Sequence, residues 1–307
     1  MNKNLHSVLM VRPSCFRVNN ETLKNNFFQS KINDISNDSI LNQAIMEFDS
    51  LVEKIKASGI KVFVYQDNLK HDTPDSIFPN NWISFHQNKT IAIYPMFANN
   101  RRLERNEDVI VFLEKNNIEI NEVVDYSEAE HNNLFLEGTG SMVLDRINNK
   151  AYCSLSERTN ENLIDEFCND FKFIPIIFNS FHTVDSKRQV IYHTNVMMCV
   201  AEKYVIICLD SIDDVQERKK VIQSLEDDNK ELIIISENQL SSFAGNMIEL
   251  KVNNDSIIIM SQNAYESLDD AQIKKISKYS EIISSSVDTI EKYGGGSVRC
   301  MIAEIFN

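Results

Sequence analysis

One cysteine, one histidine and one glutamate could together carry out nucleophilic catalysis. Cys300 follows the glycine run Gly294–Gly296 and opens an apolar stretch, so a flexible loop leads directly into a core element. A thiol placed in this way can attack an electrophilic carbon. His193 could move protons and Glu137 could accept hydrogen bonds. Each residue alone is equally compatible with a structural role, because buried cysteines and histidines are common in cores.

A repeating order of elements places these residues at equivalent points. Hairpins are predicted to begin at residues 82, 141, 196 and 247, at roughly 55-residue intervals, which is typical of stacked or radially arranged modules. After each hairpin the apolar spacing predicts a helix and then a strand. The predicted helices span 107–115, 161–167, 213–225 and 269–277, and the strands span 122–124, 172–178, 231–235 and 281–284.

The two ends of the chain supply a fifth unit. Residues 7–12 and 61–65 read as strands, and 39–58 reads as a helix that Gly59 ends. We expect residues 299–306 to pair with 7–12, which would close a ring and remove the open sheet edges. The sequence therefore predicts one α/β domain over residues 1–307, a five-bladed β/α propeller of pseudo-fivefold symmetry.

A ring makes equivalent positions face a common axis. Glu137, His193 and Cys300 each stand just before the first strand of a unit or open it, as do the amides Asn81, Asn195 and Asn246. We therefore expect a carboxylate, an imidazole, a thiol and amides to meet in one central cavity. This shared position favours a catalytic role over a separate structural reason for each residue.

Composition excludes several classes of function. The formal net charge is −14, which argues against nucleic acid or an anionic membrane as a partner. No apolar run is long enough to span a membrane, and Met1–His6 lacks the apolar stretch of a signal peptide. The six cysteines are scattered without a C-x-x-C pair, so we expect reduced thiols in a cytoplasmic protein. No metal site and no cofactor is indicated.

Several motifs in chain order resemble those of a known family. They are Phe78–Trp82 (FPNNW), Arg101–Glu104 (RRLE), Leu136–Gly140 (LEGTG), Gly140–Asp145 (GSMVLD), Ser154–Thr159 (SLSERT), His193–Asn195 (HTN) and Arg299–Met301 (RCM). With these motifs the chain resembles the guanidino-group-modifying enzymes, or penteins, over nearly its full length. This family includes arginine deiminases, dimethylarginine hydrolases, agmatine deiminases and amidinotransferases. The set is most similar to the citrulline-utilising hydrolase and amidinotransferase-like subfamily.

The resemblance implies a role for each chemical group. Cys300 would attack the guanidino or ureido carbon, and His193 would protonate the leaving amine and then activate water. Glu137 would accept hydrogen bonds from the N–H groups of the substrate. The arginines of the motifs would bind the substrate α-carboxylate by charge-assisted hydrogen bonds; they are Arg102, Arg158 and Arg299.

Two amides depart from the deiminase pattern. Deiminases carry aspartates that hold the cationic guanidinium at the places where this chain has Asn81 and Asn195. An amide can donate to a ureido oxygen and accept from a ureido N–H, so the exchange favours citrulline over arginine. Asp75 could instead supply a carboxylate to the substrate, which would weaken this preference.

The sequence thus predicts a hydrolase that converts citrulline to ornithine, carbon dioxide and ammonia through a Cys300-bound carbamoyl group. An arginine deiminase or dihydrolase, or an amidinotransferase, would use the same three residues. A non-catalytic propeller that binds a partner, as ribosome anti-association factors do, would need no aligned glutamate, histidine and cysteine. The expected partner is a small amino acid, and a homo-oligomer is compatible with the sequence.

Overall fold

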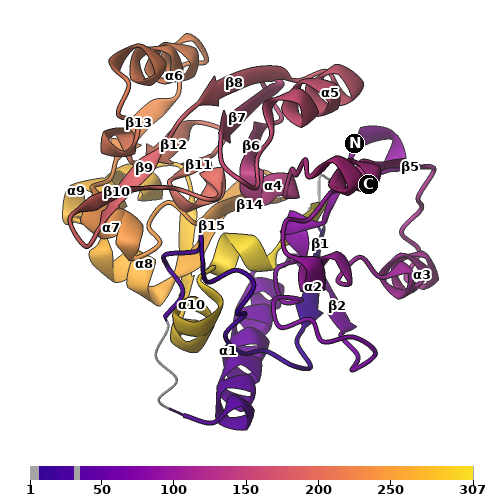
Figure 1. The fold of residues 1–307 in the computed structure, drawn as a ribbon. Helices are drawn as coiled ribbons and strands as arrows, with labels where there is room; N and C mark the ends of the chain where they lie inside the picture. The colour runs from indigo at the N-terminus through magenta and orange to yellow at the C-terminus, as the bar shows by residue number, and fades with distance from the viewer. Residues whose placement is uncertain (1–6, 31–34, 307) are drawn as a thin grey trace.

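Five three-stranded sheets of the same design make up the computed structural model, which describes residues 7–30 and 35–306 (Figure 1). In each sheet the first strand runs antiparallel to the second, and the second runs parallel to the third. The sheets are, in this order, β17 (Ala303–Ile305), β1 (Ser7–Arg12) and β2 (Lys61–Gln66); β3 (Ile83–His86), β4 (Thr90–Ile93) and β5 (Glu122–Asp125); β6 (Met142–Asp145), β7 (Lys150–Ser154) and β8 (Ile174–Phe178); β11 (Met198–Val200), β12 (Tyr204–Ile207) and β13 (Glu231–Ile234); β14 (Ile248–Val252), β15 (Asp255–Ser261) and β16 (Glu281–Ser285).

The predicted repeat is confirmed, including the pairing of the two chain ends. Ser7 pairs with Ile305 and Leu9 with Ala303 in the antiparallel ladder of β1 and β17. A helix connects the second and third strand of every unit, as a parallel pair requires; these helices are α1 (Asn37–Ala57), α3 (Glu107–Lys115), α5 (Glu161–Phe171), α6 (Val215–Asp227) and α9 (Asp270–Ser277). The five sheets are separate hydrogen-bonded units in the described part of the chain. The α/β class is therefore established, and closure into a propeller stays a prediction.

Helix α1 shows why these segments fold as predicted. Ser36 caps its first turn by accepting from the backbone N–H of Ser39, and Gly59 follows its end with a φ of +93°. One face buries Ile40, Ala44, Phe48, Leu51, Val52 and Ile55. This spacing turns a single apolar stripe toward the sheets.

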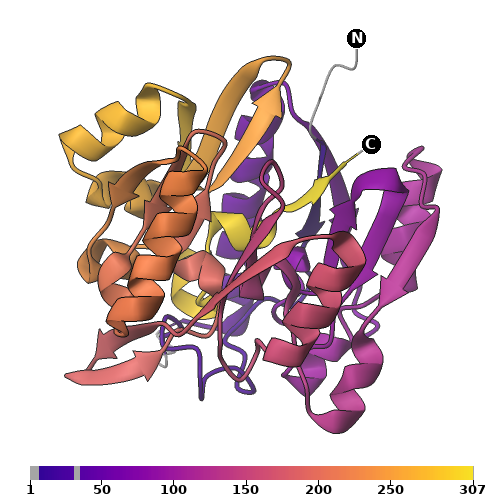
Figure 2. The ribbon, with the colours of Figure 1, turned by 90° about the horizontal axis from the view of Figure 1, so that it is seen from above.

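The core joins neighbouring units as well as the sheet and helix inside each unit. Val205 and Ile206 of β12, Leu225 of α6 and Ile258 of β15 belong to one cluster of fully buried side chains. A second cluster joins Phe48 of α1 to Ile259 of β15. Each unit therefore depends on its neighbours to bury part of its apolar surface, as in other repeat architectures. Figure 2 shows the arrangement of the units from above.

Several elements escape the sequence pattern, including the short helices α7 (Glu237–Ser241) and α8 (Gln262–Ser267). The hairpin of β9 (Phe181–Val184) and β10 (Lys187–Val190) forms a separate two-stranded sheet, and helix α10 (Asp288–Gly294) precedes the last unit. The turn of the hairpin uses Asp185 and Ser186 at φ values of +48° and +61°, without the glycine that normally marks such a turn. Its strands are mostly polar, so no alternation reveals them.

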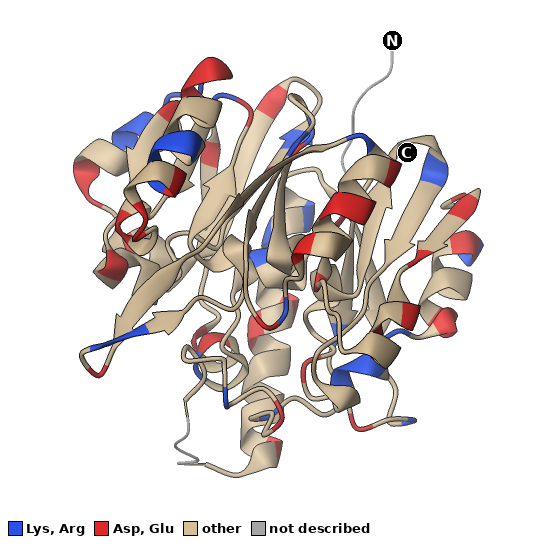
Figure 3. Ribbon diagram, turned by 45° about the horizontal axis from the view of Figure 1, so that its top comes forward, with Lys and Arg blue, Asp and Glu red and all other residues tan. Residues whose placement is uncertain are grey.

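Charged residues lie mainly on the outer helices and turns (Figure 3). None of the helices described is both long enough and apolar enough to cross a membrane.

Candidate active site

Short helical turns immediately before the first strands carry the predicted chemical groups. Such turns are η1 (Pro79–Asn81), α4 (Gly138–Ser141), η4 (Thr194–Val196) and η6 (Val298–Met301). Glu137 and His193 each directly precede one of these turns, and Cys300 lies within one. All three side chains are buried, with exposed fractions of 0%, 2% and 3%. The repeat thus brings distant residues together.

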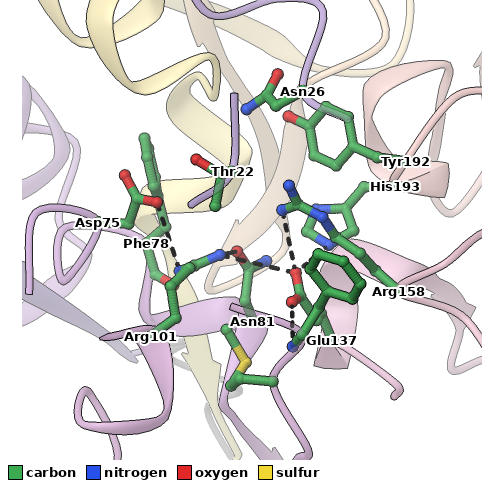
Figure 4. Close-up of polar contacts among 12 residues, drawn as sticks. Thr22, Asn26, Asp75, Phe78, Asn81, Arg101, Glu137, Arg158, Tyr192 and His193 are labelled. Atoms are coloured by element: carbon green, nitrogen blue, oxygen red, sulfur yellow. Dashed lines mark hydrogen bonds and ion pairs between the residues drawn. The ribbon is translucent and has the colours of Figure 1, made fainter. Parts of the chain in front are cut away.

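The polar groups surround a small pocket. Cys300 and His193 line one part of it, and Asp75 lines another. The other lining residues are Asn26, Phe78, Asn81, Arg101, Arg158, Tyr192, Gly294, Gly295 and Gly296. Figure 4 shows the side chains of Arg101, Arg158 and His193 converging with that of Glu137 from separate segments.

Amides surround the thiol. Asn246 Nδ2 lies 3.2 Å from Cys300 Sγ, and Asn195 Nδ2 lies 3.4 Å from it. Both are N–H donors, and a thiolate accepts such hydrogen bonds better than a neutral thiol does. The thiol therefore lies in an environment that favours its reactive form.

His193 is neutral and its tautomer is fixed. Its Nε2 lies 2.7 Å from Oε2 of Glu137. Burial lowers the pKa of His193 to about 4, although the carboxylate acts in the opposite direction. Burial disfavours the charge of Glu137, but Arg158, His193 and Arg101 outweigh it and hold the pKa of Glu137 well below its ordinary value. Because an ionised carboxylate can only accept, Nε2 carries the proton and Nδ1 is left as a base.

Two arginines and two more carboxylates form the charged end of the pocket. Arg101 binds Glu104 through two hydrogen bonds of 2.9 Å, and its Nε lies 3.7 Å from Asp75 Oδ2. Arg158 Nη1 lies 3.4 Å from Glu137 Oε2. Burial raises the pKa of Asp75, and it raises that of Glu104 to about 8 against the attraction of Arg101.

Three buried polar atoms of the site have no hydrogen-bond partner in the described part of the chain. They are Asp75 Oδ1, Arg158 Nε and Asn195 Oδ1. A buried polar atom without a partner costs about 1–3 kcal/mol, so such groups are normally satisfied. A ligand that carries both donors and acceptors would satisfy them.

The loop after β1 covers the pocket. Asn19 donates to Asp75 at 2.7 Å, and Gln29 donates to the carbonyl of Tyr293 at 2.7 Å. Asn26 donates to the carbonyls of Gly294 and Gly295, both at 3.3 Å. A Cβ added to Gly295 would lie 2.6 Å from Asn26, and one added to Gly296 would lie 3.0 Å from the Phe78 ring. The glycine run therefore permits close packing of the covering loop, whereas the sequence suggested that it exposes the thiol.

The structure separates the predicted arginines. Arg158 lies in the pocket with Asp75 and Asn81, and Asn195 contacts the thiol, whereas Arg102 and Arg299 lie outside. Arg102 donates to the carbonyls of Met96 and Phe97 and lies over the Phe135 ring. Arg299 donates to the carbonyl of Ile302 and lies 3.3 Å from Glu304.

The residue that sequence reasoning missed at the charged end is Arg101. It belongs to the single turn α2 (Asn99–Arg102), where consecutive side chains point in different directions. Only one of two adjacent arginines can face the pocket. The Arg101–Glu104 spacing of three residues was the signal in the sequence, because it places a carboxylate beside that guanidinium. Asn246 and Tyr192 also belong to the site.

Comparison with known proteins identifies the family. No curated protein sequence matches the chain. A family model described as "N,N dimethylarginine dimethylhydrolase, eukaryotic" matches residues 12–307.

Several solved structures share the fold. The apo structure of ArgZ, an arginine dihydrolase from the ornithine-ammonia cycle in cyanobacteria, matches with a TM-score of 0.74 and 17% identity, over 97% of this chain and 40% of that chain. The N-terminal domain of ArgZ bound to substrate matches with a TM-score of 0.71 and 16% identity, over 97% of each chain. A dimethylarginine dimethylaminohydrolase adduct with S-methyl-L-thiocitrulline matches with a TM-score of 0.63 and 12% identity, over 98% of this chain and 99% of that chain.

This chain thus spans about 40% of full-length ArgZ. The family match covers nearly all of its residues, and the neighbours share its fold. The chain belongs to the N,N-dimethylarginine dimethylhydrolase family, and with it to the pentein superfamily of guanidino-modifying C–N hydrolases.

Proposed function

We propose that this protein hydrolyses citrulline to ornithine, carbon dioxide and ammonia, with residues 1–307 acting as one catalytic domain whose five sheets close into a propeller. The observation that carries the choice of citrulline is the amide environment of the thiol. The side chains within hydrogen-bond distance of Cys300 Sγ in the described residues are those of Asn195 and Asn246. A neutral ureido group suits amides, whereas a buried guanidinium needs carboxylates.

The charged end fits the backbone of an α-amino acid. Arg101 and Arg158 present two guanidinium groups that can bind the α-carboxylate. Asp75 has one oxygen without a partner, and it can accept from the α-ammonium group. An amino acid bound in this way directs its side chain toward Cys300 at the other end.

The chemistry needs only groups that the pocket contains. His193 takes the thiol proton on Nδ1, and the sulfur attacks the ureido carbon. The same proton passes to the δ-nitrogen as its bond to carbon breaks, so ornithine leaves and Cys300 carries a carbamoyl thioester. Water then gives a proton to His193 and attacks the thioester. The thiol re-forms, and carbamate decomposes to carbon dioxide and ammonia. Glu137 holds His193 in the required tautomer throughout.

Arginine dihydrolysis is the second candidate, because one observation favours it. Three buried carboxylates, Asp75, Glu104 and Glu137, face two arginines, so the cluster carries one excess negative charge when all three are ionised. Arginine carries one more positive charge than citrulline and would compensate for it. ArgZ is described as an arginine dihydrolase, and AgrE has been solved with L-arginine.

A substrate screen decides between these activities. The purified protein is incubated with citrulline, arginine, agmatine or dimethylarginine, and ornithine, citrulline and ammonia are measured. We expect equal amounts of ornithine and ammonia from citrulline, and none from the Cys300→Ala variant. Ornithine with two ammonia molecules from arginine, together with little turnover of citrulline, would establish the dihydrolase instead. Addition of an acceptor amine identifies amidino transfer, and dimethylamine release identifies dimethylarginine hydrolysis.

A further inference from the structure

Asn246 contacts the reacting sulfur but has no part in the mechanism above. It stands two residues before β14, much as Asn81 stands two residues before β3 and Asn195 three residues before β11. Its side chain has an exposed fraction of 0%. Its Nδ2 lies 3.2 Å from Cys300 Sγ, slightly closer than the Nδ2 of Asn195 at 3.4 Å.

The rest of the protein fixes the orientation of this amide. Oδ1 of Asn246 accepts the backbone N–H of Arg299 at 3.0 Å, and Nδ2 also donates to the carbonyl of Asn195 at 3.0 Å. If the amide were reversed, its oxygen would face that carbonyl and its NH₂ would face an N–H group, so both hydrogen bonds would be lost. One N–H of Nδ2 is therefore directed at the sulfur before any substrate arrives.

Asn195 lacks this constraint. Its Oδ1 is buried without a partner in the described residues, so its amide can turn to meet a ligand. The two donors at the sulfur therefore differ in kind. Asn246 is a fixed donor, and Asn195 is free to serve the substrate.

We propose that Asn246 is a catalytic residue that stabilises the thiolate of Cys300 by a permanent N–H···S hydrogen bond. The inference rests on Cys300 being the nucleophile in the proposed function. Because His193 is neutral in the resting protein, no positive charge on its ring acts on the sulfur before the proton moves, and fixed dipoles must favour the thiolate as it forms. The donor acts on the free protein, so its effect can be measured without any substrate.

The test uses the exchange Asn246→Asp, which keeps the acceptor for the Arg299 N–H and replaces the donor with a carboxylate oxygen. The rate of iodoacetamide alkylation at Cys300 is measured from pH 5 to 10 by mass spectrometry of its peptide. We expect the midpoint of the alkylation profile to rise by at least about one pH unit, with roughly tenfold slower labelling at pH 7. Asn246→Ser, which retains a hydroxyl donor, should restore part of the rate.

Asn106→Asp is the matched control, because it adds the same charge away from the sulfur. Asn106 caps α3, where its side chain accepts a hydrogen bond from the backbone N–H of Asp108. This variant should leave the profile unchanged. If Cys300 of the Asn246→Asp variant is alkylated with the same rate and pH profile as in the wild type, Asn246 only anchors the backbone of Arg299 and the proposal is wrong. A shifted profile in a protein that turns over no ureido or guanidino substrate would support the donor role and reject the proposed function, so the two can fail separately.

Discussion

The two ends of the pocket are built from different chemistry. At the charged end, Arg101 and Arg158 already have carboxylate partners at 2.9 Å and 3.4 Å before any ligand binds. At the reacting end, the thiol contacts the neutral amides of Asn195 and Asn246, and the neutral ring of His193 lines the same pocket. Charge is thus concentrated where the substrate is held, whereas at the reacting end the ionised Glu137 lies against His193 and the side chains within hydrogen-bond distance of the sulfur are neutral.

This difference separates binding from chemistry. A fixed array of ion pairs can recognise a zwitterion at little cost of reorganisation. Neutral amides at the sulfur let a thiolate develop against dipoles rather than beside a carboxylate. Substitutions at the two ends should therefore change different kinetic constants.

The largest expected effect is at the sulfur. Cys300→Ala should lower kcat/KM by at least about 10⁴-fold, because no other group can form the covalent intermediate. Ornithine release measures this, and an unchanged thermal midpoint shows that the fold is intact. Residual turnover within tenfold of the wild type would mean that the sulfur is not the nucleophile.

Loss of a guanidinium at the charged end should act on binding. Arg158→Gln should raise KM roughly 100-fold, in line with about 2–5 kcal/mol for truncating a buried charge pair. Kinetics with citrulline and with its decarboxylated analogue, N-carbamoylputrescine, measure this, and the variant should lose most of the preference for citrulline.

Arg102→Gln is the matched control for that variant, because Arg102 contacts backbone carbonyls outside the pocket. Its KM should stay within about threefold of the wild type, as is usual for partly exposed side chains. If Arg102→Gln raises KM and Arg158→Gln does not, the assignment of the charged end is wrong.

A carboxylate introduced at the reacting end should shift specificity. Asn195→Asp should lower the ratio of kcat/KM for citrulline over arginine by roughly 10- to 100-fold, because a buried charge beside the head group favours a cation. Asn81→Asp should change the ratio less, since Asn81 Oδ1 already accepts from Arg101 at 2.8 Å and a new carboxylate would pair with that arginine. Equal ratios in all three proteins would show that neither amide contacts the head group.

The smallest effect concerns pH. The mechanism needs neutral His193, and its pKa is lowered to about 4. Between pH 7 and 5 we therefore expect kcat/KM to show no loss from this group. Below about pH 4 the rate should fall as the ring gains a proton, roughly tenfold per unit. An acid limb with a midpoint near 6.5, the ordinary value for histidine, would contradict a buried neutral imidazole.

The same shift predicts how stability depends on pH. A histidine whose pKa is lower in the folded than in the unfolded state stabilises the fold fully above the unfolded value. That contribution is lost as pH falls from about 6.5 toward 4, because the unfolded chain takes up the proton first. Thermal midpoints of the wild type and of His193→Gln over this range measure it.

Much of the fold could be predicted because short-range sequence patterns mark each repeat unit. Hairpin turns such as Asn148–Lys150 and the amphipathic spacing of α1 mark each unit, and the equivalent places of Glu137 and His193 follow from counting. The orientation of side chains within one turn does not follow, so the sequence motif favours Arg102 whereas Arg101 lies in the pocket. The loop that covers the pocket, with Asn19 and Asn26, has no regular hydrophobic spacing from which its position could be predicted.

The pairing of β1 with β17 also has a consequence for the order of events during synthesis. The sheet that follows Cys300 needs Ser7–Arg12 from one end of the chain and Ala303–Ile305 from the other. During synthesis β1 therefore lacks its antiparallel neighbour until β17 has been translated and has left the ribosome. A nascent chain can complete its inner units early, but it cannot present a reactive thiol in a finished pocket until the last strand is made. Premature termination would yield partly folded protein without catalytic activity.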